Sequence, residues 1–145
     1  TAKAAAVRLD ASVTAFSPEE PADALLAWEE ISRHLRMHAQ SAGESETIES
    51  LRAQFESLSE RMAILLRTFG NPTTSPLRIA HCPMAFDSRG GEWIQSGEQV
   101  DNAYFGSAMR TCGTIRASVE PGEYLSTTAS GETAELAPAM TGHNH

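Results

Sequence analysis

The chain has 145 residues, a formal net charge of -8 at pH 7 and a sequence pI near 5.0. This length is sufficient for one domain with a hydrophobic core, but the acidic balance argues against nucleic acid or an anionic membrane surface as a partner, because both require a basic face. No run of roughly eighteen apolar residues occurs, so no direct membrane insertion is expected.

The first sixteen residues predict a short extended N-terminal arm. Apolar and polar residues alternate at several positions between Val7 and Phe16. Alternation of this kind is typical of a strand with one buried face.

A long helix is predicted to begin at Ser17 and to run to about Ala39 or Ala42. Ser17 is a favourable N-cap, Pro18 suits the first helical position, and Glu20 is placed to complete a capping box. Residues on one face recur at helical spacing: Ala24, Trp28, Ile31, Leu35 and His38. This stripe predicts a face that is buried against another element.

A second helix is predicted between Gly43 and Gly70. Its apolar residues recur at alternating spacings of three and four: Ile48, Leu51, Phe55, Leu58, Met62, Leu65 and Phe69. Gly70 is a typical helix terminator, and Pro72 prevents continuation. Because the connection between the two helices is short, they are expected to pack as an antiparallel hairpin.

The remaining chain predicts one further helix among irregular segments. Residues 73–79 are expected to form an irregular connecting segment. The glycines of residues 86–102 favour turns. A last helix is expected over residues 103–111, with Asp101 or Asn102 as its cap.

The expected fold class is therefore all-α. We predict an antiparallel bundle of three to four helices with a short extended N-terminal arm and a flexible C-terminal tail. The arm covers residues 1–16, the helical domain residues 17–115, and a weakly structured tail residues 116–145, which are rich in Ser, Thr, Gly, Ala and Glu.

Both cysteines of the chain lie in two short segments that also contain methionine. Cys82 and Met84 belong to the first segment, His81-Cys82-Pro83-Met84, and Met109 and Cys112 to the second. Thiolate and thioether sulfur together favour soft ions such as Cu(I), whereas zinc sites use Cys and His. Cys82, Met84, Met109 and Cys112 offer four sulfur atoms, and His81 adds a nitrogen donor. Together these five side chains form a candidate site for Cu(I) and also for Ag(I).

Spacing alone leaves two other interpretations of the cysteines open, a pair of inert thiols and a structural disulfide. A disulfide between Cys82 and Cys112 would close a loop of about thirty residues and stabilise the fold by about 3–4 kcal/mol in the chain-entropy model. Thiols close enough to share an ion are also nearly close enough to oxidise, so the metal site and the disulfide can be redox states of one site.

Weaker signals suggest secondary metal ligands. His34 and His38 are one helical turn apart, although a buried histidine with a hydrogen-bond partner explains such a pair equally well. Met140 and His143, followed by His145, form either a metal-capturing tail or a merely solvated one. No acid–base pair, Ser-His-Asp order or phosphate-binding glycine loop is present, so we expect no enzyme.

Five blocks of the chain carry a resemblance to a known family. They are Leu65 to Gly70, His81 to Phe86, Gly91 to Trp93, Asn102 to Gly106 and Met109 to Gly113. Together they resemble a bacterial domain, first catalogued as of unknown function, that occurs in secreted proteins and at the ends of CusB-like periplasmic adaptor subunits of heavy-metal efflux pumps. The resemblance spans about Phe55 to Gly113, and Ala103 departs from it where many members have proline.

The resemblance implies a copper-binding helical module in the periplasm or outside the cell. It implies that Cys82, Met84, Met109 and Cys112 are ligands, with His81 beside them, and that Trp93 and Phe105 pack around the site. Our leading hypothesis is a non-enzymatic Cu(I)-binding module for metal tolerance or delivery, with a heavy-metal efflux complex or another periplasmic copper protein as partner.

Two further hypotheses remain. One is a structural interaction domain that is disulfide-linked and holds no metal. The other is haem ligation or electron transfer through His81 or Met109, which ranks last because the chain has no CxxCH motif.

Overall fold

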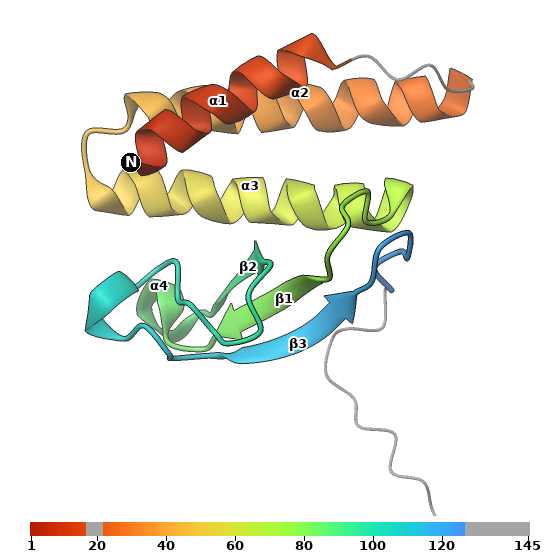
Figure 1. The fold of residues 1–145 in the computed structure, drawn as a ribbon. Coiled ribbons are helices and arrows are strands. Elements are labelled where there is room, and N and C mark those ends of the chain that lie inside the picture. Colours follow the sequence, from red (N-terminus) through yellow and green to blue (C-terminus); the bar gives the residue numbers. More distant parts are fainter. Residues whose placement is uncertain (17–21, 127–145) are drawn as a thin grey trace, which may run out of the picture.

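The structure, a computed structural model, describes residues 1–16 and 22–126. Within these residues it contains three long helices and a three-stranded antiparallel sheet, so the fold is mixed α/β (Figure 1). In chain order the elements are α1 (Ala2–Ala15), α2 (Ala22–Glu44), α3 (Ile48–Phe69), β1 (Leu77–Cys82), α4 (Ala85–Ser88), β2 (Gly91–Gln95), the single 3-10 turn η1 (Gly106–Ala108) and β3 (Thr114–Val119). The predicted all-α bundle is therefore wrong.

Helix α1 replaces the predicted extended arm. The Thr1 side chain accepts a hydrogen bond from the Ala4 backbone N–H at 3.3 Å and caps the helix. Alanine has the highest helix propensity, and the segment contains several alanines. Leu9 and Val13, spaced by four, pack together on one helical face in the core with α2 and α3. The helix propensity of alanine and the helical spacing of Leu9 and Val13 thus outweighed the weak alternation of apolar and polar residues.

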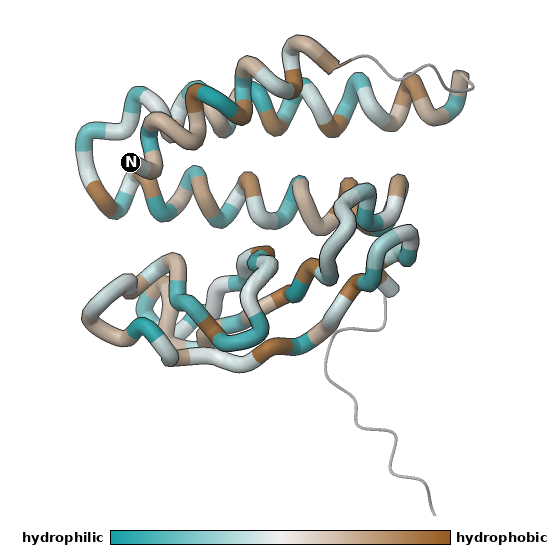
Figure 2. Tube along the Cα trace, in the orientation of Figure 1, coloured by the Kyte–Doolittle hydropathy of each residue, from teal (hydrophilic) through white to brown (hydrophobic). Residues whose placement is uncertain are grey.

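Helices α2 and α3 form an antiparallel hairpin that packs with α1 as a helical layer (Figure 1). The Thr47 side chain caps α3 by accepting from the Ser50 N–H at 3.1 Å. Gly70 ends α3 with φ 77°, and its N–H donates to the Leu66 carbonyl at 3.2 Å. The predicted cap at Ser17 lies outside the described residues. Apolar and polar residues interchange along each long helix (Figure 2), which gives each one a buried face.

The sheet has the strand order β2-β1-β3 and lies beside α3 (Figure 1). Ala80 of β1 is opposite Trp93 of β2 and Ile115 of β3. Because side chains alternate along a strand, Ile79, which packs with Leu66 of α3, faces the helix. Cys82 therefore lies on the opposite face of β1.

The structure corrects four further expectations. The connector after Pro72 continues into β1, and the turns expected around Trp93 are replaced by β2. The helix expected over residues 103–111 is reduced to the η1 turn. Strand β3 occupies residues that we assigned to the start of the tail.

In the described part of the chain, no helix is both long and apolar enough to cross a bilayer.

A candidate dithiol site

The structure brings the two cysteines into contact. The Cys82 and Cys112 sulfur atoms lie 3.3 Å apart, and both thiols are free. Cys82 is the last residue of β1 and is fully buried, whereas Cys112 is partly exposed. The pair is thus a dithiol with one buried member and one member near the surface.

Sheet register explains this contact. His81 of β1 is opposite Thr114 of β3 in the antiparallel pair. The chain that leads into β3 therefore passes the end of β1, and Cys112, two residues before Thr114, meets Cys82. Gly113 lies against β1 here, because a Cβ atom at this position would be 2.7 Å from the His81 carbonyl oxygen.

Asn102 holds the segment that carries Cys112. Its side chain is buried, with 2 % exposure, and its Nδ2 donates to the Cys112 carbonyl at 2.7 Å. Its Oδ1 accepts from the backbone N–H groups of Tyr104 and Phe105 at 2.8 and 2.9 Å. The sequence identified Asn102 only as a helix cap. It does cap these two N–H groups, but its role beside the dithiol was missed.

The two thiols differ in acidity. Burial acts to raise the pKa of Cys82, but hydrogen bonds from the Cys112 thiol, the Met84 and Ala85 backbone and the Asn102 side chain together lower it below that of a free thiol. The hydrogen bond to Cys82, followed by burial, raises the pKa of Cys112. Hydrogen bonding therefore favours the thiolate form of Cys82 and the thiol form of Cys112.

A strained turn follows Cys82. Phe86, Asp87 and Ser88 have φ values of 52°, 55° and 67°, in the left-handed region that residues other than glycine avoid. The Phe86 ring packs against Tyr104, with ring centroids 5.0 Å apart, and the Tyr104 hydroxyl donates to the Glu92 carbonyl at 2.6 Å. These contacts hold the turn in its unfavourable conformation. No sequence signal indicated it.

The two methionines of the candidate site lie at the surface. Met84 is 50 % exposed and directly precedes α4, and Met109 is 39 % exposed and follows η1. Met109 and Cys112 do not share a helical face as predicted. Instead the Cys112 N–H donates to the Met109 carbonyl at 3.0 Å in a turn.

Comparison with known families adds one finding. A family model described as "Protein of unknown function (DUF3347)" matches residues 1–74, which is just over half of the 145 residues. The chain belongs to the DUF3347 family. The match includes α1, α2 and α3 and ends before β1, so both cysteines of this DUF3347 protein lie beyond it. No curated protein and no solved structure matches the chain.

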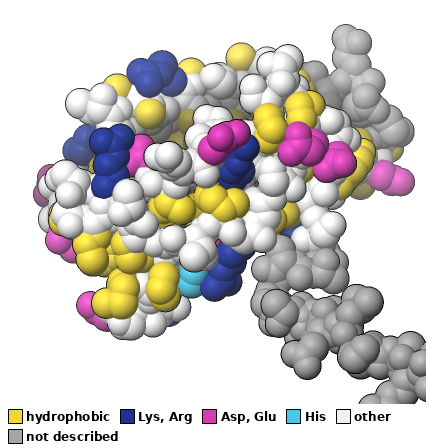
Figure 3. Space-filling model, turned by 60° about the horizontal axis from the view of Figure 1, so that its bottom comes forward, with side chains coloured by type: hydrophobic (Ala, Val, Ile, Leu, Met, Phe, Trp, Pro, Cys, Tyr) yellow, Lys and Arg dark blue, Asp and Glu magenta, His cyan; other side chains and the backbone are white. Residues whose placement is uncertain are grey.

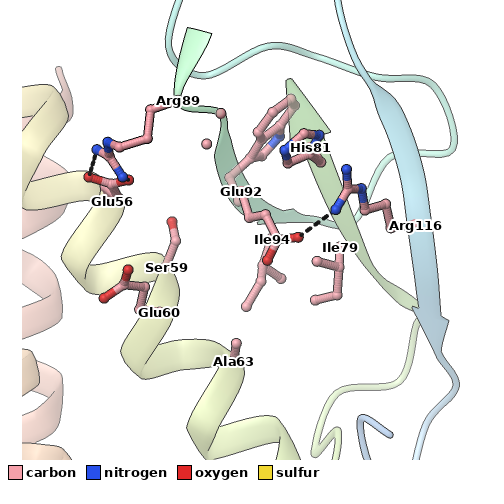
Figure 4. A pocket seen from close by; sticks show the side chains of 13 residues that line it. Glu56, Ser59, Glu60, Ala63, Ile79, His81, Arg89, Glu92, Ile94 and Arg116 are labelled. Atoms are coloured by element: carbon pink, nitrogen blue, oxygen red, sulfur yellow. Dashed lines mark hydrogen bonds and ion pairs between the residues drawn. The ribbon is translucent and has the colours of Figure 1, made fainter. Parts of the chain in front are cut away.

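In this DUF3347 chain His81 lies on the other face of β1 from Cys82. Its side chain borders a cavity of about 250 Å³ between α3 and the sheet, beside Glu92 and Arg116 (Figure 4). Burial and the neighbouring Arg116 lower the pKa of His81, while Glu92 acts in the opposite direction. The structure therefore separates His81 from the sulfur atoms.

Trp93 and Phe105, which we expected to pack around the site, lie in the same apolar cluster as Cys82. Trp93 is 2 % exposed, and its indole N–H donates to Gln95 at 3.0 Å. Tyr104 joins this cluster, with its ring centroid 5.8 Å from that of Trp93. The buried side of the dithiol is thus shielded from water.

The secondary ligands that we considered lie elsewhere. His38 shares a hydrogen bond of 2.9 Å with Gln54 of α3, and the buried His34 Nδ1 has no partner among the described residues. Met140 and His143 lie outside the described residues. Residues 1–16 and 22–126 contain no group of three His, Cys, Asp or Glu side chains arranged to hold a metal ion.

The surface around the sheet has no single-sign field. Basic, acidic and hydrophobic side chains are interspersed on the face shown in Figure 3. In the cavity beside His81, Arg89 pairs with Glu56 at 2.8 Å and Arg116 with Glu92 at 3.6 Å. Neighbouring carboxylates therefore balance the charges of these two arginines.

Proposed function

We propose that the Cys82–Cys112 dithiol binds one Cu(I) ion, or Ag(I), which has the same preference for soft ligands. The observation that carries the proposal is the 3.3 Å separation of two free thiols. Thiolates select soft monovalent copper over harder ions. The neighbouring Met84 and Met109 thioethers would complete the ligand set after a rotation of their exposed side chains.

The dimensions of the pair suit an ion between the sulfur atoms. Thiolate bonds to zinc are roughly 2.3 Å long, so two bonds of similar length span the 3.3 Å gap with a bent angle or a small separation of the sulfurs. Metal binding displaces the thiol protons. The lowered pKa of the Cys82 thiol makes the first of these protons easier to remove.

Exposure of one side of the site suits exchange of the ion with another protein. Cys112 is partly exposed and both methionines reach the surface, while Cys82 is closed off behind them. An incoming ligand would meet the thioethers and Cys112 first. We therefore propose a non-enzymatic periplasmic module that holds Cu(I) for tolerance or delivers it to an efflux system.

An anaerobic titration of the fully reduced chain with Cu(I) against a competing chelator tests this function. We expect one tight equivalent per chain. Replacing Cys82 or Cys112 by Ser should weaken binding by more than the roughly 10- to 100-fold typical of losing an outer-shell partner. Met84→Leu and Met109→Leu should weaken it less, while Met37→Leu, at a methionine of α2 that is 51 % exposed, is the matched control.

His81 provides the discriminating variant. Because its side chain lies across the strand from the thiols, His81→Ala should leave Cu(I) affinity near that of the parent. Binding no tighter than micromolar in the parent chain would refute the proposal. A larger loss with His81→Ala than with Cys112→Ser would show that the ligands are wrongly assigned.

The same short contact supports a second candidate, a disulfide-linked interaction domain. Closing the pair to a disulfide bond of about 2.05 Å requires the sulfur atoms to approach by roughly 1.3 Å. This candidate predicts a native mass lower by two hydrogens, a loss of stability on reduction and indifference to copper. Mass spectrometry before and after reduction distinguishes the two.

A further inference from the structure

A second, larger cavity lies between α1, α3 and the sheet, and three of its lining residues, Leu9, Leu58 and Met62, also belong to the helix-paired core. It has a volume of about 490 Å³ and is bordered by the N-terminal half of α1, the first four turns of α3 and the sheet residue Ile94. In Figure 1 the N-terminus of α1 lies beside the beginning of α3, and Ala2 and Ile48 at these two ends both border the cavity. Binding pockets for small molecules typically measure about 300–1,000 Å³, so its size is that of a ligand site.

The wall of this cavity is almost entirely apolar. Leu9 of α1 and Leu51, Phe55 and Met62 of α3 line it, and Ala5 leaves space on the α1 side. The hydroxyl of Ser59, which also borders it, already donates to the Phe55 carbonyl at 2.9 Å. An occupant must therefore present hydrocarbon to most of the wall.

Among the described residues that line this cavity, Arg52 is the one with a charged side chain. It is half-buried, and within residues 1–16 and 22–126 it has no ion-pair partner. The cavity beside His81 is different, since Arg89 and Arg116 there each have a glutamate partner. A guanidinium without a carboxylate partner at the wall of an apolar cavity offers an anion a charge-assisted contact.

We propose that this cavity binds a fatty acid, with the carboxylate on Arg52 and the acyl chain against Leu51, Phe55 and Met62. Arginine and carboxylate form a charge-assisted, bidentate pair. The apolar wall would contact the acyl chain of the fatty acid, and the guanidinium of Arg52 would bind its single carboxylate. The cavity is lined by neither Cys82 nor Cys112, although Phe55 also packs against the apolar cluster that contains Cys82. The test below is made without copper, so its failure and the failure of the copper proposal are distinguishable.

Calorimetric titration of the full chain tests the proposal with three probes of equal chain length. These are dodecanoate, dodecanol and the cation dodecyltrimethylammonium, with the two ions kept below their micelle-forming concentrations and dodecanol below its solubility limit. We expect one dodecanoate per chain, bound about tenfold or more tightly than dodecanol, as a charge-assisted contact requires. The cation should bind more weakly than the alcohol.

Two substitutions make the assignment specific. Arg52→Gln should reduce dodecanoate affinity to that of dodecanol and leave dodecanol binding unchanged. Arg67→Gln, at an exposed arginine near the other end of α3, is the matched control and should change neither. Ala5→Trp, at an exposed position of α1, should fill the cavity and abolish binding of both probes while the melting temperature stays near that of the parent.

Several results would overturn this assignment. Equal affinities of the parent for dodecanoate and dodecanol, or equal effects of Arg52→Gln and Arg67→Gln, would remove the role of Arg52. A dimer in sedimentation that Ala5→Trp dissociates would assign the cavity to a second copy of the chain. Binding that appears only after removal of residues 127–145 would assign it to the chain's own C-terminal segment.

Discussion

Asn102 shows how one buried polar side chain can organise a site. Both ends of its amide are hydrogen-bonded, to the Cys112 carbonyl on one side and to the N–H groups of Tyr104 and Phe105 on the other. Buried polar groups stabilise a fold only when they are satisfied in this way. The position of Cys112 therefore depends on a residue ten positions earlier in the chain.

Asn102→Ala should destabilise the reduced protein by about 2–3 kcal/mol, because it leaves buried backbone groups without partners. It should also weaken Cu(I) binding by roughly 10-fold or more, as expected when a residue that orients a ligand is lost. Urea unfolding and the chelator titration measure the two effects. Gln99→Ala, in the same loop but exposed, is the control, and equal effects of the two variants would contradict this role for Asn102.

His81 should make stability depend on pH. Its pKa is lowered in the fold by burial and by Arg116, so the unfolded chain binds a proton more readily than the folded chain. Its contribution to stability is therefore present above the ordinary histidine pKa of about 6.5 and decreases as pH falls below that value. We predict that His81→Gln makes the decrease in the free energy of unfolding between about pH 7 and pH 5 shallower.

This measurement needs a second variant, because the pKa of His34 is also lowered, by burial and by nearby Arg61 and Arg33. His34→Gln reports its own share, and the double variant should have the shallowest slope. A His81→Gln profile parallel to that of the parent would mean that His81 titrates alike in the folded and unfolded chain.

At the scale of elements, the left-handed turn after Cys82 is the least favourable backbone in the described structure. Each non-glycine residue in this conformation costs about 1–2 kcal/mol, and Phe86, Asp87 and Ser88 are consecutive. Such strain persists only where surrounding contacts impose it. Here Phe86 lies between Tyr104 and the Arg89 guanidinium, which is 4.7 Å from the ring centroid.

Ser88→Gly should therefore stabilise the protein by about 1 kcal/mol, since glycine adopts this conformation without strain and the Ser88 side chain is exposed. Urea unfolding at constant pH measures it. Ala53→Gly, at an exposed position of α3, should instead destabilise by about 1 kcal/mol. If both glycines destabilise alike, the turn stores no strain.

The elements that the sequence predicted are those specified by local signals. The apolar residues of α3 recur at helical spacing along the helix. The helix ends at Gly70 because glycine adopts the positive φ of a helix terminus without strain. The strands of the sheet depend instead on pairing between segments far apart in the chain, such as Ile79 with Ala117. Short apolar runs of this kind do not reveal their partners, so β1 and β2 were taken for a connector and turns.

The same distinction applies to the candidate site. The grouping of Cys and Met in two short segments suggested one shared site, although spacing alone left the state of the cysteines open, and in the structure the Cys82 and Cys112 sulfur atoms lie 3.3 Å apart. Residue types and spacing were not sufficient for His81, because its separation from Cys82 follows from strand alternation, which matters only once β1 is known to be a strand. Met109 failed as a helical partner of Cys112 because Asn102 caps turns rather than a full helix.

At the scale of the whole molecule, α3 joins two parts with different roles. One side of α3 packs with α1 and α2, the helices that the DUF3347 family model also matches. Its other side packs against the sheet that carries the dithiol. Phe55 of α3 touches Tyr104, with ring centroids 5.6 Å apart, and Glu56 pairs with Arg89 of the strained turn. Stabilising the dithiol should therefore stabilise the helices as well.

Unfolding in urea with and without Cu(I) tests this coupling. At a free Cu(I) concentration about 100 times the Kd, linkage predicts a gain of about 2.7 kcal/mol if the ion binds only the folded chain. Circular dichroism follows the long helices, and in a Trp28→Phe background fluorescence follows Trp93 beside the site. Because α3 contacts both parts, both signals should shift together to the same higher midpoint. A shift of the Trp93 transition alone would mean that the sheet unfolds independently of the helices, and no shift in either would leave the disulfide-linked domain as the better account of the cysteine pair.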